Sequence, residues 1–186
     1  MELSTAIFGR RSTRNFTPVP VTDAQLRELI TAATYAPSAM NEQACHFTVI
    51  TKGALLRKIS GHAKAHALEE FGLESHIDHV RQTLGEPQFD ILYGAPALVV
   101  ISAPEASRWA VADCALAAEN LMLAAAGMKL GTCWIGFAQD WLATPEGRAA
   151  IGLRKDLVPV APIIVGHPGT PMPAVERREP HIDWIR

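Results

Sequence analysis

Three arginines lie within five positions near the start of the chain, in residues 10–14 (RRSTR). Guanidinium groups bind phosphate through paired hydrogen bonds, and a serine hydroxyl or a backbone N–H group can complete the shell. The whole chain has a formal net charge of -2, so this positive charge is concentrated locally. It predicts a site for a small anion, with a solvated basic turn as the alternative. Arg177 and Arg178 could form a second clamp on the same anion, although each taken singly is typical of a surface arginine.

A second segment with hydrogen-bonding side chains is "APSAMNEQACHF", residues 36–47. It contains Ser38, Asn41 and Gln43 and few charges. Amide side chains both donate and accept hydrogen bonds, which suits the edge of a heterocycle. Taken alone, the segment is equally typical of a capped polar loop.

The third segment, "GTCWIGF" at residues 131–137, combines glycines with apolar and aromatic side chains. It is not a Walker phosphate loop, because no Lys-Ser or Lys-Thr pair follows Gly136, and the chain has no G-x-G-x-x-G pattern for a Rossmann site. Glycine here would let a flat ring approach the backbone closely. The alternative is an ordinary core strand that ends in a turn.

The bulk composition fits a single globular domain spanning residues 1–186. Hydrophobic residues make up 48% and charged residues 19%, which excludes a disordered chain. The slightly negative net charge argues against general nucleic-acid binding. The start of the chain lacks the apolar core of a signal peptide. We expect no membrane span, because Asp113, Glu119 and Asn120 interrupt the apolar stretch 110–127.

The three cysteines, Cys45, Cys114 and Cys133, are far apart and form no C-x-x-C pair. Their number and spacing argue against a disulfide framework, an iron–sulfur module or a cysteine-rich zinc site. They favour a reducing, cytoplasmic location. We expect none of the three thiols to be catalytic.

Helices that would position these segments can be predicted from periodicity and capping signals. A short helix is expected before Gly9. Thr22 and Gln25 form a capping-box pattern at the start of the next helix, and Pro37 ends it. Further helices are predicted over residues 53–84, over residues 105–127, and from Thr144-Pro145-Glu146 onward.

Strands are predicted over residues 46–51, 95–103, 131–137 and 157–168. The last of them contains prolines, which predict a strand at an edge or with irregular pairing. Strands and helices are interleaved irregularly along the chain. The predicted fold class is therefore α+β rather than a doubly wound sheet.

Taken together and in this order, these segments resemble the FMN-dependent nitroreductase family, in a short form. The pattern is R-R-S-x-R from residue 10, P-S-x-x-N-x-Q from residue 37, a long helix leading into "GTCWIGF", and a final "VGHP…P…RR". The resemblance covers most of the chain except residues 53–90. It implies a nitroreductase-like α+β fold, with a central mixed or antiparallel sheet flanked by helices, in a dimer.

The resemblance assigns the FMN phosphate and ribityl chain to the first arginine segment, that is, to Arg10, Ser12, Arg14 and, beside them, Arg11. Arg177 or Arg178 would be a more distal partner of the phosphate. The loop that touches the flavin, partly from the other subunit, corresponds to Pro37, Ser38, Asn41 and Gln43. The backbone near the reactive side of the isoalloxazine ring corresponds to Trp134, Ile135 and Gly136. Some relatives carry Glu in that last segment, and this chain does not.

The activity implied by the resemblance is carried by the flavin rather than by a catalytic side chain. NADH or NADPH gives hydride to flavin N5, the nicotinamide leaves, and a small electrophile such as a nitroaromatic or quinone takes its place, in a ping-pong scheme. The partners expected are a second copy of the chain, with flavin sites shared between the two chains, and this small-molecule acceptor. Neither nucleic acid nor a membrane is expected as a partner.

Two other functions remain open at this point. The chain could bind FMN as a storage or sensor module without efficient turnover. It could also be a hydrolase that uses Ser38 or Ser102 with His167, although the sequence lacks a G-x-S-x-G elbow.

Residues 53–90 are expected to form a variable helical lid near the mouth of the pocket. Within them His62 and His66 are four positions apart, and His76 and His79 are three apart, so each pair could face one side of a helix. No H-E-x-x-H pattern is present, and the neighbouring carboxylates are typical of a solvated helix. No metal site is therefore predicted.

Overall fold

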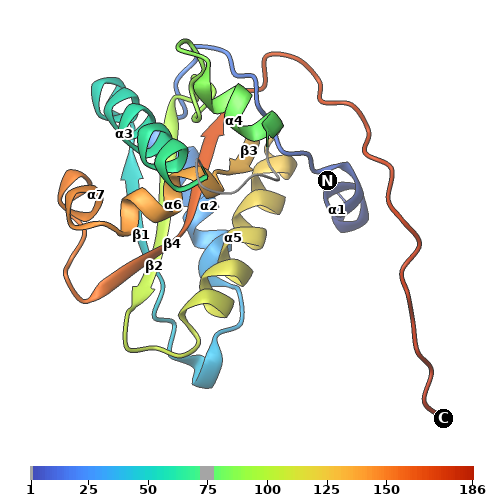
Figure 1. The fold of residues 1–186 in the computed structure, drawn as a ribbon. Coiled ribbons are helices and arrows are strands. Elements are labelled where there is room, and N and C mark those ends of the chain that lie inside the picture. The colour runs from blue at the N-terminus through green and yellow to red at the C-terminus, as the bar shows by residue number, and fades with distance from the viewer. Residues whose placement is uncertain (1, 72–77) are drawn as a thin grey trace.

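The computed structural model describes residues 2–71 and 78–186, so residues 1 and 72–77 lie outside the described part. Figure 1 shows the helices and strands packed together, while residues 171–186 run away from them as an extended segment. The elements are α1 (Leu3–Gly9), α2 (Asp23–Thr34), η1 (Ala39–Asn41), β1 (His46–Ile50), α3 (Gly53–Phe71), α4 (Asp78–Gly85), β2 (Ala97–Pro104), α5 (Ala110–Gly127), β3 (Gly131–Trp134), α6 (Gly136–Ala143), α7 (Pro145–Ala150) and β4 (Leu157–Gly166).

The strands of the described part form one antiparallel sheet in the order β1-β2-β4-β3. His46 of β1 pairs with Ser102 of β2, and Leu98 of β2 pairs with Ile164 of β4. Helices cover both faces of this sheet (Figure 1). The predicted α+β class is therefore confirmed, and the sheet is antiparallel rather than mixed.

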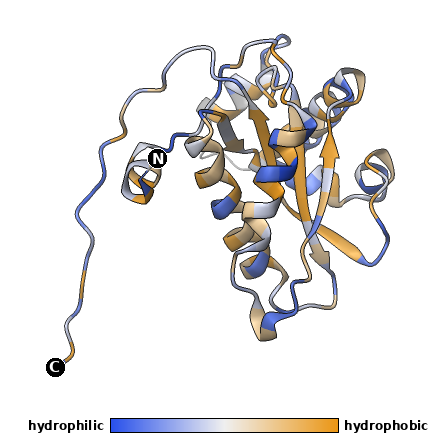
Figure 2. Cartoon of the chain, turned by 180° about the vertical axis from the view of Figure 1, so that it is seen from behind, coloured by the Kyte–Doolittle hydropathy of each residue, from blue (hydrophilic) through white to orange (hydrophobic). Residues whose placement is uncertain are grey.

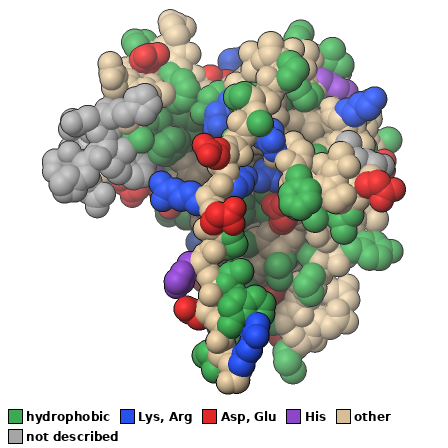
Figure 3. Space-filling model, turned by 90° about the vertical axis from the view of Figure 1, so that its right-hand side faces the viewer, with side chains coloured by type: hydrophobic (Ala, Val, Ile, Leu, Met, Phe, Trp, Pro, Cys, Tyr) green, Lys and Arg blue, Asp and Glu red, His purple; other side chains and the backbone are tan. Residues whose placement is uncertain are grey.

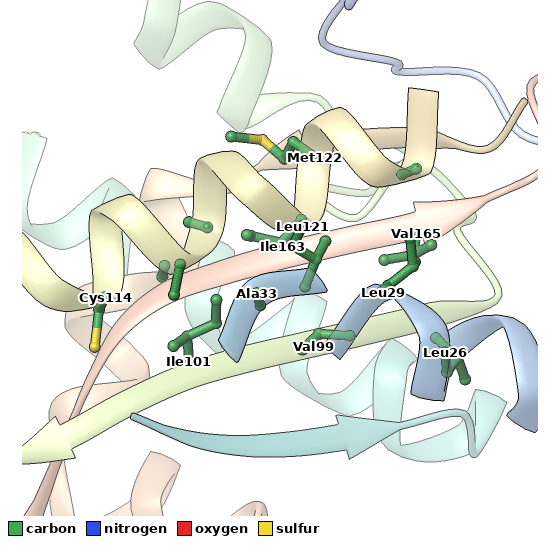
Figure 4. Packing of buried hydrophobic residues seen from close by; sticks show 14 of the residues in the cluster. Leu26, Leu29, Ala33, Val99, Ile101, Cys114, Leu121, Met122, Ile163 and Val165 are labelled. Carbon is green, nitrogen blue, oxygen red and sulfur yellow. The ribbon is translucent and has the colours of Figure 1, made fainter. Parts of the chain in front are cut away.

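Successive side chains of a strand point to opposite faces of the sheet, and here they form two apolar layers, one on each face. Val99 and Ile101 of β2 pack with α2 and α5, whereas Leu98 and Val100 pack with α3 and α6. This is the period of two expected of a strand buried on both faces. Figure 4 shows the first layer, in which Leu29 of α2 points toward the sheet. Figure 2 shows that the strands and most of α5 are hydrophobic.

Several local predictions are confirmed by the structure. The Thr22 side chain accepts from Gln25 N, and Gln25 Oε1 accepts from Thr22 N, so α2 begins with the predicted capping box. Helix α5 ends at Gly127, and α7 begins at Pro145. Helices α3 and α4 lie within the predicted helical region 53–84, of which residues 72–77 are outside the described part.

Two predicted boundaries are wrong. Helix α5 begins at Ala110 instead of residue 105, because the chain first makes a turn in which Ser107 N donates to Pro104 O at 3.0 Å. The predicted strand 131–137 ends at Trp134, and Gly136 begins helix α6, which was not predicted. The apolar residues that α6 buries stand at helical spacing: Ala138, Trp141 and Leu142.

The strand β4 has the predicted irregular pairing but not the predicted edge position. It lies between β2 and β3, and its register with β2 shifts next to Ser102. Pro162 accepts from Ile135 N, and the N and C=O groups of one residue point to the same side of a strand. The nitrogen of Pro162, which carries no hydrogen, therefore points to the region beyond the end of β3. The hydrogen bonds between β4 and β2 are on the other side of the strand and do not need it.

By length and apolar composition alone, α5 could cross a membrane. In the fold it is a core helix instead, with 44% of its residues buried, mostly against the sheet and α2. Its small residues allow this close packing, since eight of its side chains are buried and half of those are alanines. The interruption by Asp113 and Glu119 has a structural role, because each of these carboxylates holds a segment of the candidate site.

Candidate functional site

The arginine segment is fixed to strand β3. Thr13 N donates to Thr132 O at 2.9 Å, and Ser12 forms a parallel bridge with Thr132. The side chain of Thr13 is buried against Gly131, where a Cβ atom would be 2.6 Å from Thr13 Oγ1. The structure thus brings the first and third predicted segments together within one chain.

Four arginines surround one cavity of about 380 Å³, which we call the arginine cavity. Its lining comprises Arg10, Arg11, Ser12, Arg14, Met172, Pro173, Val175 and Arg177. Figure 3 shows Lys and Arg side chains gathered in a hollow of this face, beside the C-terminal segment. Such a concentration of guanidinium groups is suited to an anion.

The arginines differ in how their donors are used. Arg11 donates to the carbonyl oxygens of Phe8, Arg10 and Pro173, so it ties α1 to the C-terminal segment. Arg10 Nε is buried and has no hydrogen-bond partner among the described residues; the carboxylate of Glu119 lies 3.5 Å away. Arg10 Nε therefore has an ion-pair partner in Glu119 but no hydrogen bond within the described part of the chain.

The C-terminal arginines are separated by the structure. Both are exposed, but Arg177 lines the arginine cavity and Arg178 lies outside its lining. Of the two candidates for a distal phosphate contact, Arg177 is therefore the one next to the arginine segment.

A second cavity, of about 270 Å³, lies on the other side of Arg14, and we call it the ring cavity. Arg14 lines both cavities, which makes it their junction. The predicted backbone segment Trp134, Ile135 and Gly136 forms part of the ring cavity. Its remaining lining residues are His66, Ala67, Glu70, Ile91, Tyr93, Cys133, Phe137 and Asp140. Helix α3 thus contributes to the lining of this cavity, and the role of residues 53–90 as a lid stays a prediction.

Positive charge from the arginine segment extends into the ring cavity. Burial raises the pKa of the Cys133 thiol, and Arg14, a hydrogen bond with Ser12, and Arg10 oppose that rise. Burial likewise raises the pKa of Tyr93, and the charge of Arg14 opposes it. A ligand bound across the two cavities would therefore experience a positive field at their junction.

The predicted loop Pro37–Gln43 is built separately from the arginine segment. Ser38 Oγ accepts from Gln43 N at 3.0 Å, and Gln43 Nε2 donates to Asn41 Oδ1 at 3.1 Å. Met40, Asn41 and Gln43 all have positive φ, between 50° and 54°. Non-glycine residues rarely adopt this conformation, and clustered strain of this kind is typical of functional loops.

Asp113 in the first turn of α5 anchors this loop. Its Oδ1 atom accepts from Ala39 N at 3.1 Å, and the side chain is buried. Ser38 and Gln43 line a small cavity of about 80 Å³ together with Cys45. The loop therefore has a fixed place beside the N-terminal half of α5.

Within one chain the structure does not bring the loop and the arginine segment together. Asp113 holds the loop near the start of α5, whereas Glu119, further along the same helix, lies beside Arg10. Figure 1 shows η1 at the end of the molecule away from α1 and the arginine segment. None of the described cavities is lined by both segments.

The structure does not support the alternative function as a hydrolase that uses a serine and His167. Ser102 pairs with Pro159, whereas His167 follows the opposite end of β4, beyond Gly166. Ser38 Oγ is engaged with the backbone of Gln43. Neither serine is placed next to His167, so the nucleophile and its base are not assembled.

The histidines of α3 pair with carboxylates rather than with each other. His62 Nδ1 lies 3.3 Å from Glu146 Oε1, and His66 Nε2 lies 3.4 Å from Glu70 Oε1. Within the described residues no three potential ligands gather as a metal site would require. His76 and the side chain of His79, which were considered with them, lie outside the described part.

Sequence reasoning missed two features of this region. Tyr93 lines the ring cavity, although it follows the region treated as a variable lid; the turn residues around it, in "YGAP", were the available signal. Cys45 Sγ and Cys114 Sγ lie 3.9 Å apart next to the loop. That proximity depends on the packing of the segment before β1 against α5, so nothing in the local sequence could indicate it.

Comparison with known proteins gives consistent results. A family model described as "Nitroreductase family" matches residues 7–167. A protein of Archaeoglobus fulgidus, named putative NADH dehydrogenase/NAD(P)H nitroreductase, is 29% identical over 167 residues, which cover 87% of this chain and 83% of the relative. Nitrobenzene nitroreductase of Ectopseudomonas oleovorans is 26% identical over 200 residues, with coverage of 90% and 87%.

Among solved structures, a nitroreductase with bound FMN from Bacteroides fragilis superposes with a TM-score of 0.85. The two chains are 26% identical, and the match covers 100% of each.

Proposed function

The chain belongs to the nitroreductase family, and on that basis we propose that it is an FMN-dependent enzyme that oxidises NADH or NADPH and reduces a small electrophilic acceptor. The observation that carries the proposal is the position of Arg14, which lines both the arginine cavity and the ring cavity. FMN has a phosphate at one end and a flat ring at the other. A site with clustered arginines on one side and a largely apolar cavity on the other suits both ends.

The residues present fit this cofactor. Arg10 has a buried Nε atom without a hydrogen-bond partner among the described residues, and Arg14 and Arg177 face the same cavity. Charge-assisted hydrogen bonds from such groups to phosphate are about twice as strong as neutral ones. We assign the phosphate and ribityl chain to Arg10, Ser12 and Arg14, with Arg177 as the distal contact. Arg11 supports them by holding the C-terminal segment in place.

The ring cavity supplies the place for the flat ring. When bound, FMN would supply the redox chemistry at its N5 atom, between NADH or NADPH as hydride donor and a nitroaromatic or quinone as acceptor, in a ping-pong scheme. The backbone of Trp134, Ile135 and Gly136 would lie along the ring and exclude water from one side. His66 and Glu70 of α3 also line this cavity, in which the nicotinamide and the acceptor would bind in turn.

We further propose that two chains share each flavin site. In one chain the loop Pro37–Gln43 is away from the arginine segment, so it would reach the flavin held by a second subunit. The outer face of α5 supports this, because Val111 is 68% exposed and Leu116 45% exposed, and Phe8 of α1 is 78% exposed. Apolar side chains gathered on neighbouring helices are typical of an interface between subunits.

The proposed activity is tested by purifying the protein and recording its visible spectrum, then adding NADH or NADPH with a quinone. We expect a yellow protein that holds FMN and oxidises the nucleotide through many turnovers per flavin. A colourless protein that FMN does not bind would contradict the proposal. Tight FMN binding without steady turnover would instead support a storage or sensor module.

A further inference from the structure

Two of the three cysteines form a thiol pair next to the Pro37–Gln43 loop. Cys45 Sγ and Cys114 Sγ lie 3.9 Å apart in a hydrogen bond in which either sulfur could be the donor, and both are free thiols. The two sulfurs of a disulfide are about 2.05 Å apart, so these two atoms would need to approach by about 2 Å to form one. Cys45 can supply this movement, because it lies outside the helices and strands, between η1 and β1.

The two thiols differ in their access to small molecules. Cys45 is half-buried and lines the cavity of about 80 Å³, whereas Cys114 is buried in α5 and is not among the described lining residues of that cavity. A cavity of this size has room for a molecule as small as hydrogen peroxide. The hydrogen bond with Cys114 also lowers the pKa of Cys45, against the opposing effects of burial and of the charge of Asp113. Cys45 is therefore the thiol that an oxidant would meet first.

Consecutive residues of α5 hold the two ends of the loop. Asp113 Oδ1 accepts from Ala39 N at 3.1 Å, and Cys114, the next residue, contacts Cys45. Residues 39–45 therefore lie between two attachments to one turn of α5, and they include the three loop residues with positive φ. The second attachment is weak, because a thiol is a poor hydrogen-bond donor and acceptor. A covalent bond at this point would fix the loop on α5 at both ends.

We propose that Cys45 and Cys114 are a site of oxidative modification, at which hydrogen peroxide converts the thiol pair into a disulfide that fixes the Pro37–Gln43 loop on α5. The Cys45 thiolate attacks one peroxide oxygen, so that an S–O bond forms, the O–O bond breaks and hydroxide leaves. The Cys114 sulfur then attacks the Cys45 sulfur, so that the S–S bond forms, the S–O bond breaks and a second hydroxide leaves. The two thiols lose two electrons and two protons, and the peroxide becomes two molecules of water.

The first test maps the linkage in the purified full chain after treatment with one equivalent of hydrogen peroxide. Remaining thiols are alkylated during denaturation, and trypsin, which cuts after Lys and Arg, leaves the three cysteines in separate peptides, residues 28–52, 109–129 and 130–148. Mass spectrometry should find the first two peptides linked, on a chain that still migrates as a monomer in a non-reducing gel, and dithiothreitol should separate them. Cys133, whose Sγ donates to Trp134 O at 3.5 Å, is the internal control and should be alkylated. No linkage, a linkage that includes Cys133 or a linkage between two chains would overturn the proposal.

The second test establishes which thiol reacts with the peroxide. In Cys114→Ser the reaction should stop at the sulfenic acid of Cys45, which dimedone traps and mass spectrometry detects. In Cys45→Ser the buried Cys114 should gain little adduct over the same time. The opposite order of reactivity would overturn the assignment of Cys45 as the attacking thiol.

The third test asks whether the disulfide fixes the loop. Asn41 N donates to Ser38 O at 3.0 Å, and Gln43 N donates to Ser38 Oγ at 3.0 Å, so exchange of these amide hydrogens reports opening of the loop. Oxidation should slow their exchange about tenfold or more in the wild type. Peroxide should leave their exchange unchanged in Cys114→Ser, the matched control. A disulfide that forms without slowing the exchange would contradict the fixing of the loop. None of the three readouts uses flavin or turnover, so they stand apart from the proposed function.

Discussion

Thr13 lies so close to Gly131 that position 131 has no space for a side chain. A Cβ atom on Gly131 would lie 2.6 Å from Thr13 Oγ1 and 2.7 Å from Thr13 Cγ2. Thr13 N also donates to Thr132 O, so the arginine segment cannot withdraw from β3 without losing that bond. The contact fixes the arginine segment next to the strand that leads into Trp134, Ile135 and Gly136.

The first prediction concerns this contact. Gly131→Ala should lower the free energy of unfolding by about 1–3 kcal/mol, the usual cost of overpacking, and should reduce bound flavin. Denaturant unfolding of the apo-protein and flavin content after purification measure the two effects. Gly127→Ala is the matched control, because no atom lies within 4 Å of its Cβ position. A Gly131→Ala protein with wild-type stability and flavin content would contradict the contact.

Arg10→Ala should weaken FMN binding by about 1.5–3 kcal/mol, the range for a hydrogen bond to a charged group. Riboflavin, which lacks the phosphate, should lose much less. Titration of the apo-protein with both ligands decides this, with the exposed Arg27→Ala as the control for loss of positive charge. Equal losses for the two ligands would show that Arg10 does not bind the phosphate. In the same assay, Arg177→Ala should cost more affinity than Arg178→Ala, because only Arg177 lines the arginine cavity.

Asp113→Ala should loosen the loop that carries Ser38 and Asn41. The buried carboxylate accepts from Ala39 N, and its loss leaves a strained loop without its anchor. We expect stability to fall by about 1–3 kcal/mol and FMN affinity to fall with it. Asp113→Asn retains an oxygen acceptor and should keep most of the affinity. If the Ala and Asn variants bind FMN equally well, Asp113 has no part in placing the loop.

The cysteines should not be required for turnover. Burial raises the pKa of Cys133, and a hydrogen bond with Cys45 raises that of Cys114, so neither forms a thiolate readily. The bond from Cys114 lowers the pKa of Cys45, so Cys45 should be alkylated first, as mass spectrometry would detect. With all three replaced by Ser, quinone reduction per bound flavin should be retained. A collapse to background with flavin still bound would assign a thiol to the chemistry, and single variants would identify it.

Local signals in the sequence were enough for most of the fold. Thr22 and Gln25 indicated the start of α2, and the apolar run at residues 97–103 indicated β2, because capping and burial are encoded by near neighbours. The position of β4 inside the sheet could not be predicted in this way. A proline is tolerated in β4 where its nitrogen faces a side of the strand that has no partner there. Only the tertiary structure shows that the pairing of β3 with β4 ends at Trp134 and Ile163, next to Pro162.

The candidate site was likewise predictable from the sequence only in part. The arginine segment and residues 134–136 were predicted from residue types and a family resemblance, and the fold brings them together through Thr13 and Gly131. Tyr93 escaped prediction because its position depends on the hydrogen bonds of Asp90 to a distant helix. The difference between Arg177 and Arg178 depends on the path of the C-terminal segment over the arginine cavity, which adjacent identical residues cannot reveal.

The central claim is that one flavin site is built from the arginine segment of one subunit and the Pro37–Gln43 loop of another. It makes complementation between two defective proteins possible. One variant carries Arg10→Ala with Arg14→Ala, and the other carries Ser38→Ala with Asn41→Ala. Each homodimer should bind little flavin and have weak activity, since every site in it has a defect.

The most direct measurement is the activity of heterodimers made by exchanging subunits between these two variants. If the sites are shared, one site in each heterodimer collects all four substitutions and the other is intact. NAD(P)H oxidation with a quinone should then recover to about half the wild-type activity per dimer, with one FMN bound. If each site is built within one chain, every site keeps a defect. Confirmed heterodimers that recover neither flavin nor activity would contradict the account.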